Sequence, residues 1–123
     1  ESLKKKSIEF GLSSKVYFYN SVQNYQTPKI YSSHKIFVNL SPDGMFDKTV
    51  FEAMACGCLP IVSSEAFSEI NIPKAKNIPE LVLRLEDCLK KNVETDFLRA
   101  MVLENHSLNK LSSRLHTEIS KLL

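Results

Sequence analysis

Little net charge, few cysteines and no long apolar run characterise this chain of 123 residues. The formal net charge of +2 gives no indication of a nucleic-acid partner, because such partners are held by many clustered basic side chains. No apolar run in the sequence approaches the roughly 20 residues that a helix needs to cross a bilayer. No secretory signal is visible either. We therefore expect neither a nucleic-acid-binding protein nor a membrane-spanning one.

The cysteines and histidines are also too few and too scattered for a disulfide framework or a metal site. The cysteines are odd in number (Cys56, Cys58 and Cys88), and a single glycine separates the first two. That spacing suits neither a disulfide framework nor zinc. The histidines lie far apart in the sequence, at His34, His106 and His116. No pair has the spacing of a helical metal site, so we interpret none as catalytic. Small apolar thiols of this kind are typical of a reducing compartment, which predicts a cytoplasmic protein.

What the sequence does contain suits one globular domain with one core. Apolar residues make up 43% and charged residues 24%, an ordinary balance, so disorder is not expected over the chain as a whole. The first residue is Glu1 rather than Met, which suggests a fragment or a trimmed chain.

Short β-rich segments alternate with helical patterns along the chain. Strands are expected near residues 15–19, 35–40 and 59–63, and helices over 1–12, 28–33, 47–56 and 79–90, with further helical segments at the end. This alternation predicts an α/β fold with a parallel sheet and helices on both faces. The closing helices carry an apolar seam, namely Phe97, Met101, Leu108, Leu111, Leu115, Ile119 and Leu122.

The strand, turn, helix and strand over residues 35–64 predict a ligand site. In α/β sheets the crevice outside the carboxyl ends of the strands binds ligands. We expect the unpaired N–H groups of Phe46 to Thr49 to point at that crevice and to hold a diphosphate with help from the helix dipole. Lys48 adds a charge, and Glu52 lies one turn further on, where it can accept from a ribose hydroxyl pair.

The charged residues at the start of this helix are Asp47, Lys48 and Glu52, and each also has a plainer interpretation. Asp47 is either a helix cap or a contact to the ligand. Lys48 is either a phosphate ligand or a solvent lysine, and Glu52 is either a ribose ligand or a solvated glutamate near a helix N-terminus.

The central motif resembles the donor lobe of glycosyltransferase family 4. Its core is Glu52-Ala-Met-Ala-Cys-Gly57 followed by Leu59-Pro-Ile-Val62, and the segment from Val16 to Val22 resembles the family's upstream Val-x-Phe-x-Gly-x-Val. The resemblance implies a GT-B architecture of two Rossmann-like lobes. This chain would be the C-terminal, nucleotide-sugar-binding lobe, incomplete at its N-terminus.

The resemblance also implies an activity and a set of ligands. The family transfers sugars with retention from nucleotide-sugar donors, usually without a metal, in glycan or polysaccharide biosynthesis. It implies that Glu52 binds the donor ribose and that the backbone of Met45 to Lys48 approaches the diphosphate and sugar. The implied donor-binding set is Gly44, Met45, Phe46, Asp47, Lys48, Thr49 and Glu52. The catalytic group stays unassigned.

Three positions depart from the family pattern. Gly44 stands where the family has the first glutamate of its Glu-x₇-Glu pair, a contact that Asp43 or Asp47 would have to take over. Asp47 replaces a glycine, and Glu65-Ala-Phe67 replaces a Gly-Gly turn. The lobe's first strand and its phosphate-binding Arg and Lys are expected before Glu1.

The expected partners are a nucleotide sugar, an N-terminal acceptor lobe and a glycan or lipid-linked acceptor, with peripheral membrane association of the whole enzyme as a further expectation. Without the acceptor lobe, the apolar stripe of the last helix should be exposed toward Ile119 and Leu122. The alternatives are a non-catalytic module that binds nucleotides or docks to a partner, and a pseudo-enzyme with a structural role.

Overall fold

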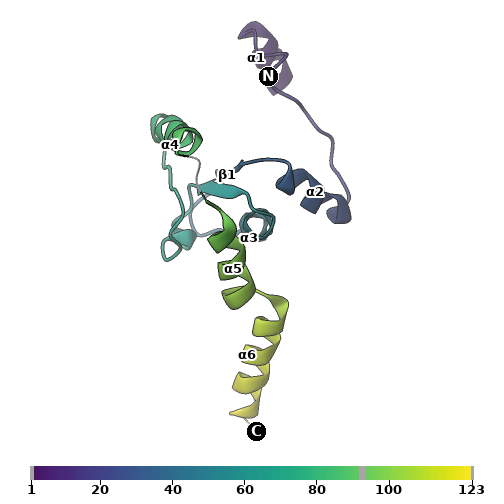
Figure 1. Ribbon diagram of the computed structural model, residues 1–123, viewed down its shortest axis with the longest axis vertical. Helices are drawn as coiled ribbons and strands as arrows, with labels where there is room; N and C mark the ends of the chain where they lie inside the picture. The colour runs from purple at the N-terminus through teal and green to yellow at the C-terminus, as the bar shows by residue number, and fades with distance from the viewer. Residues whose placement is uncertain (1, 92–93, 123) are drawn as a thin grey trace.

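The computed structural model describes residues 2–91 and 94–122 and has a mixed α/β architecture (Figure 1). Strand β1 (Ile36–Asn39) pairs in parallel with β2 (Leu59–Val62), with Ile36 opposite Leu59. Helix α3 (Lys48–Ala55) joins the two strands and packs against both. The predicted fold class, a partial Rossmann-like lobe with a parallel sheet, is confirmed.

The other elements surround this unit. Figure 1 shows α4 on the side of the sheet away from α3, with α1 and α6 at opposite ends of the molecule. They are α1 (Leu3–Glu9), the 3₁₀ turn η1 (Asn24–Gln26), α2 (Thr27–Ser32), the 3₁₀ turn η2 (Glu65–Phe67), α4 (Ile78–Lys90), α5 (Asp96–Asn105) and α6 (Leu108–Ser120). The helices predicted near the N-terminus and over residues 28–33, 47–56 and 79–90 are therefore confirmed, while Glu1 lies outside the described residues.

The predicted strand at residues 15–19 is wrong. These residues form no strand, and the side chains of Val16 to Tyr19 are exposed. β-branched and aromatic residues favour an extended backbone, but a strand forms only where a neighbour accepts and donates its hydrogen bonds. No described segment pairs with these residues, so their β propensity alone does not produce a strand.

A third parallel segment instead lies beside β2, where the sequence did not predict one. The amide of Val62 donates to the carbonyl of Pro73 at 3.1 Å, and the amide of Ala75 donates to the carbonyl of Val62 at 2.9 Å. These two bonds form an isolated parallel bridge between Val62 and Lys74. The order β1, β2, residues 73–75 brings three carboxyl ends to one edge of the sheet.

The core lies between α3, β2 and α5. Val50 and Met54 repeat at four-residue spacing on α3 and are fully buried, with Leu98 of α5 packed in the same cluster. Gly57 ends α3 with φ of 85°, a left-handed conformation that glycine adopts without a steric penalty. This packing fixes the direction in which the N-terminus of α3 points.

On the C-terminal helices the buried face differs in part from the predicted seam. On α5 the buried residues are Leu98 and Val102, while Phe97 is about half exposed. The predicted seam was therefore wrong at Phe97, because the face of α5 that packs against α3 carries Leu98 and Val102 instead. On α6 no described residue is buried.

Candidate functional site

The start of α3 is built by hydrogen bonds that converge on Asp47. Its Oδ1 accepts from the amide of Thr49 at 2.9 Å and from the Thr49 hydroxyl at 2.8 Å. Its Oδ2 accepts from Nδ2 of Asn39 at 2.9 Å. Asn39 ends β1 and is buried, and its Oδ1 accepts from the amide of Ser41 at 3.1 Å. The end of the strand and the start of the helix are thereby held together.

These bonds identify Asp47 as the cap of α3. The Thr49 hydrogen bonds, and after them that of Asn39, lower the pKa of Asp47, so the carboxylate is charged at neutral pH. The expectation that the Thr49 amide is unpaired is wrong, because the cap takes it. Within the described chain the amides of Phe46, Asp47 and Lys48 donate to no acceptor, so three of the four predicted donors remain available.

The turn before the helix is shaped by Gly44. The amide of Met45 donates to the carbonyl of Pro42 at 3.3 Å, which confirms the turn predicted after β1. Gly44 has φ of 82°, a conformation that costs other residues roughly 1–2 kcal/mol. A glutamate at this position, as in the family pattern, would strain the backbone. The departure at Gly44 is therefore consistent with the shape of the loop.

A groove of about 520 Å³ runs beside the first turns of α3, between α3, α5 and α6. Three of the predicted site residues, Phe46, Lys48 and Glu52, line it. The residues that complete its lining are Phe51, Ala55, Val102, Asn105, His106, Ser107, Leu111 and Arg114. The structure thus brings three predicted site residues at the start of α3 together with side chains from residues 102–114, which lie 50 or more positions later in the sequence.

Aromatic rings form one wall of this groove. Phe46 is 56% exposed and stacks on Phe67, with ring centroids 5.0 Å apart and planes at 14°. His106 lies against Phe51 at 4.2 Å between ring centroids. Burial, and after it the charge of Arg114, lowers the pKa of His106. The imidazole is therefore neutral at physiological pH and adds an apolar surface rather than a charge.

The charged groups of the groove are Lys48, Glu52 and Arg114. Within the part of the chain that the structure describes, the Glu52 carboxylate accepts no hydrogen bond and forms no ion pair. Burial, followed by the charge of Glu52, raises the pKa of Tyr31 on α2. Glu52 itself is half-buried, and its carboxylate oxygens are open to accept hydrogen bonds.

A second cavity, of about 440 Å³, lies at the carboxyl edge of the sheet. The loops after β1, after β2 and after the Lys74 bridge all contribute to it. Its lining consists of Leu40, Ser41, Pro42, Asp43, Ser63, Ala75, Lys76, Asn77 and Ile78. We call it the carboxyl-edge crevice. The hydroxyl of Ser63 donates to the carbonyl of Ser41 at 2.8 Å and ties the first two loops together.

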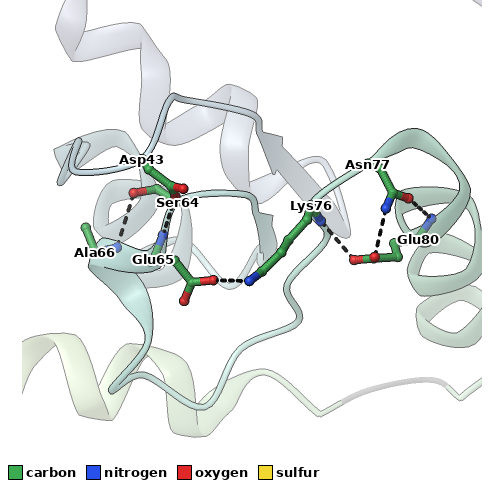
Figure 2. A network of polar contacts seen from close by, with 7 residues as sticks. All are labelled: Asp43, Ser64, Glu65, Ala66, Lys76, Asn77 and Glu80. Atoms are coloured by element: carbon green, nitrogen blue, oxygen red, sulfur yellow. Dashed lines mark hydrogen bonds and ion pairs between the residues drawn. The ribbon is translucent and has the colours of Figure 1, made fainter.

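Polar contacts also join the rim of this crevice from loop to loop, as Figure 2 shows. The amide of Glu65 donates to Oδ1 of Asp43 at 2.9 Å. The Glu65 carboxylate pairs with Nζ of Lys76 at 2.6 Å, and the Lys76 amide donates to Oε2 of Glu80 at 3.0 Å. Asp43, one of the two residues suggested to replace the missing glutamate, therefore belongs to the rim.

The predicted site residues thus fall into three groups. Phe46, Lys48 and Glu52 line the groove, Asp47 and Thr49 form the helix cap, and Gly44 and Met45 belong to a turn that lines neither cavity. Sequence reasoning missed four contributors, namely Asn39, Lys76, His106 and Arg114. Asn39 carried a usable signal, because an amide side chain at the end of a buried strand needs a hydrogen-bond partner.

The described residues show no cluster of three or more His, Cys, Asp or Glu side chains that could hold a metal ion. The cysteines are free, with Cys58 buried and Cys56 and Cys88 half-buried. Among the described helices, none is long and apolar enough to cross a membrane.

The structure is thus an α/β domain with a crevice at the carboxyl ends of parallel strands and a helix N-terminus beside it, which is the place where α/β sheets bind ligands. A protein-family model described as glycosyl transferase-like matches residues 3–116, which is most of the chain. The chain belongs to this family, which indicates a role in glycosyl transfer and transferase activity in general. No curated protein and no solved structure gives a significant match to it.

Proposed function

We propose that this chain is the donor-binding part of a retaining, GT-B-type glycosyltransferase that resembles family 4. It holds a nucleotide sugar whose sugar is transferred to a glycan or lipid-linked acceptor, and the acceptor lobe is supplied by other residues of the enzyme. One observation carries the proposal: Phe46, Lys48 and the unpaired carboxylate of Glu52 line one groove at the start of α3, and within the described chain the amides of Phe46, Asp47 and Lys48 have no acceptor.

The diphosphate of the donor would bind at these amides. The amides of Phe46, Asp47 and Lys48 have no acceptor among the described residues, and the helix dipole favours an anion at this end of α3. The charged carboxylate of Asp47, which is hydrogen-bonded to Thr49 and Asn39, repels a diphosphate at this position and has to be offset by a nearby cation. Lys48 adds a positive charge from the groove side. The amides and Lys48 offset part of the negative charge, and the proposal, like the family it resembles, invokes no metal ion.

The ribose would bind to Glu52. Lys48 and Glu52 are four residues apart on α3, a spacing that places both on one helix face, roughly 5–6 Å apart between Cβ atoms. A charged carboxylate with both oxygens open can accept from two neighbouring hydroxyl groups. Phe46 and His106 offer flat apolar surfaces in the same groove. The groove therefore suits a nucleoside better than a small anion alone.

Titration of the isotope-labelled chain with UDP, GDP and ADP tests the proposal. We expect chemical-shift changes at Phe46 to Lys48 for at least one nucleotide, with weak affinity because further phosphate ligands lie elsewhere in the enzyme. Glu52→Gln should weaken this binding by about tenfold to a hundredfold, since a charge-assisted hydrogen bond contributes roughly 1.5–3 kcal/mol.

Glu104→Gln is the matched control, because it removes the same charge from an exposed position on α5 outside the groove. It should bind as the unmodified chain does. If all three nucleotides leave residues 44–52 unperturbed, or if Glu52→Gln binds with unchanged affinity, this site is not the donor site.

A further inference from the structure

Among the described residues that line the carboxyl-edge crevice, Lys76 supplies the basic side chain. Its ammonium is held by a neighbouring loop, since Nζ lies 2.6 Å from Oε1 of Glu65. The backbone of Glu65 is held in turn, because its amide donates to Asp43 at 2.9 Å (Figure 2). The position of the Lys76 ammonium is thus set by contacts with both other strand-end loops.

The backbone of Lys76 is fixed from the other side by the first turn of α4. Its amide donates to Oε2 of Glu80 at 3.0 Å, and Oε1 of Glu80 accepts from Asn77 at 2.8 Å. The hydrogen bond with Glu65, and after it the charge of Glu65, raises the pKa of Lys76, so the group is an ammonium at neutral pH. An ammonium has three N–H donors, and Glu65 uses one of them.

The charge balance of the crevice decides which ligand suits it. Asp43 and Lys76 line the crevice, and Glu65, Glu80 and Arg84 lie around Lys76, which makes three carboxylates against two cations. A phosphate or carboxylate ligand would meet a small net repulsion here, because these exposed charges are screened by solvent. A neutral ring with several hydroxyl groups would not, because hydroxyls donate to carboxylates and accept from an ammonium.

The groove beside α3 has the opposite balance. Lys48 and Arg114 face the single carboxylate of Glu52 there, and His106 is neutral. Gly44 and Met45 line neither cavity, but in the chain they join Asp43, which lines the crevice, to Phe46, which lines the groove. A ligand with an anionic nucleotide at one end and a neutral sugar at the other therefore matches the pair of cavities in one direction only.

We propose that Lys76, positioned by Glu65, is a specificity-determining residue that binds a hydroxyl group of the transferred sugar in the carboxyl-edge crevice, and that this sugar is a neutral hexose. This inference rests on the proposed function, because it needs the diphosphate to bind at the start of α3. Lys76 has no counterpart in the motif that carries the family resemblance.

The test compares nucleoside diphosphates with their glucose conjugates on the same chain. Lys76→Met keeps the length of the side chain and removes its donors. It should weaken binding of the nucleotide glucose by about three- to tenfold, the range of one net hydrogen bond, and leave nucleoside diphosphate binding unchanged. Lys76→Arg, which restores donors and charge, should recover most of the lost affinity.

Lys90→Met is the matched control. Lys90 is also an exposed lysine with a carboxylate partner, with its side chain 73% exposed against 69% for Lys76, but it lies at the far end of α4. This variant should bind both ligands as the unmodified chain does. Circular dichroism confirms that each variant is folded.

The outcomes separate the two proposals. If nucleoside diphosphates bind and Lys76→Met affects them as much as the glucose conjugate, or affects neither, the role of Lys76 is wrong while the donor site stands. If neither ligand perturbs residues 44–52, the proposed function fails and this inference fails with it. The conjugate of glucuronate should bind more weakly than that of glucose, and equal affinities would refute the preference for a neutral sugar.

Discussion

Asp47 shows how one side chain both stabilises a helix and shapes the surface around it. Its carboxylate accepts from the amide and the hydroxyl of Thr49, so that amide is paired. The three preceding amides, those of residues 46–48, keep no acceptor within the described chain. The sequence left the roles of cap and donor contact open at this position. The structure assigns the role of cap, and Asn39, eight residues earlier, supports it because its side-chain amide donates to the second oxygen of Asp47. A local pattern does not contain that contact.

We predict that Asp47→Ala destabilises the chain by about 1–2 kcal/mol, because it removes the cap and leaves the buried amide of Asn39 without its partner. Urea unfolding followed by circular dichroism measures the change. Asp87→Asn, an exposed substitution on α4, should shift the unfolding free energy by less than about 0.5 kcal/mol. Equal effects of the two substitutions would mean that the cap contributes nothing specific.

The same residue predicts a dependence of stability on pH. The pKa of Asp47 is lower in the folded chain than its ordinary value of about 3.9, so the folded state binds the proton less well than the unfolded state. This contribution to stability is present above the ordinary pKa and is lost as the pH falls through the folded value. Unfolding free energies measured from pH 6 to pH 3 should decrease less steeply for Asp47→Asn than for the unmodified chain. Parallel curves would exclude this role.

At the scale of elements, the local sequence patterns correctly predicted the two strands and the helix between them. The strands at Ile36–Asn39 and Leu59–Val62 and the helix α3 between them follow from β-rich runs, a four-residue apolar repeat and Gly57. The strand predicted at residues 15–19 was wrong because a strand forms only where a neighbouring segment pairs with it, whatever its β propensity. The bridge at Lys74 was missed because prolines surround a very short segment, and only its hydrogen bonds to Val62 reveal it.

The candidate site was predictable only along α3 and the turn before it. Phe46 in that turn and Lys48 and Glu52 on the helix carry motif and spacing signals, and the structure places all three in one groove. His106 and Arg114 reach that groove through the packing of α5 on α3 and the turn into α6. Nothing in their local sequence indicates this position, because it arises from long-range packing.

Helix α5 gives a direct test of which helix face is buried. Leu98 is fully buried and Phe97 is 49% exposed, although both are large apolar residues and they are adjacent in sequence. Leu98→Ala should cost about 2–5 kcal/mol of unfolding free energy, because it leaves a cavity against α3. Phe97→Ala should cost much less. Chemical denaturation of both variants decides, and a larger loss for Phe97→Ala would show that α5 is rotated from the orientation described.

At the scale of the whole molecule, the buried core is concentrated between Val50 and Val102. Helices α1 and α6 extend from it at opposite ends (Figure 1). The predicted exposure of the C-terminal stripe toward Ile119 and Leu122 is confirmed, and it extends back to Leu108. A continuous apolar stripe on an exposed helix usually marks a surface that another partner covers.

This leads to a prediction for α6 that differs from the one for α5. Leu115 and Ile119 are 53% and 55% exposed, so the double substitution Leu115→Gln with Ile119→Gln removes little buried surface. Glutamine and leucine have similar helix propensities, and isoleucine is slightly less favourable, so the helix itself should persist. We expect an unfolding free energy within about 0.5 kcal/mol of the unmodified chain and fast amide exchange from Leu108 to Leu122 in both. If the unmodified chain shows concentration-dependent sedimentation, the double variant should lose it. A loss of more than about 2 kcal/mol with slow exchange through Leu122 would show that α6 folds back onto the sheet and that this stripe belongs to the core.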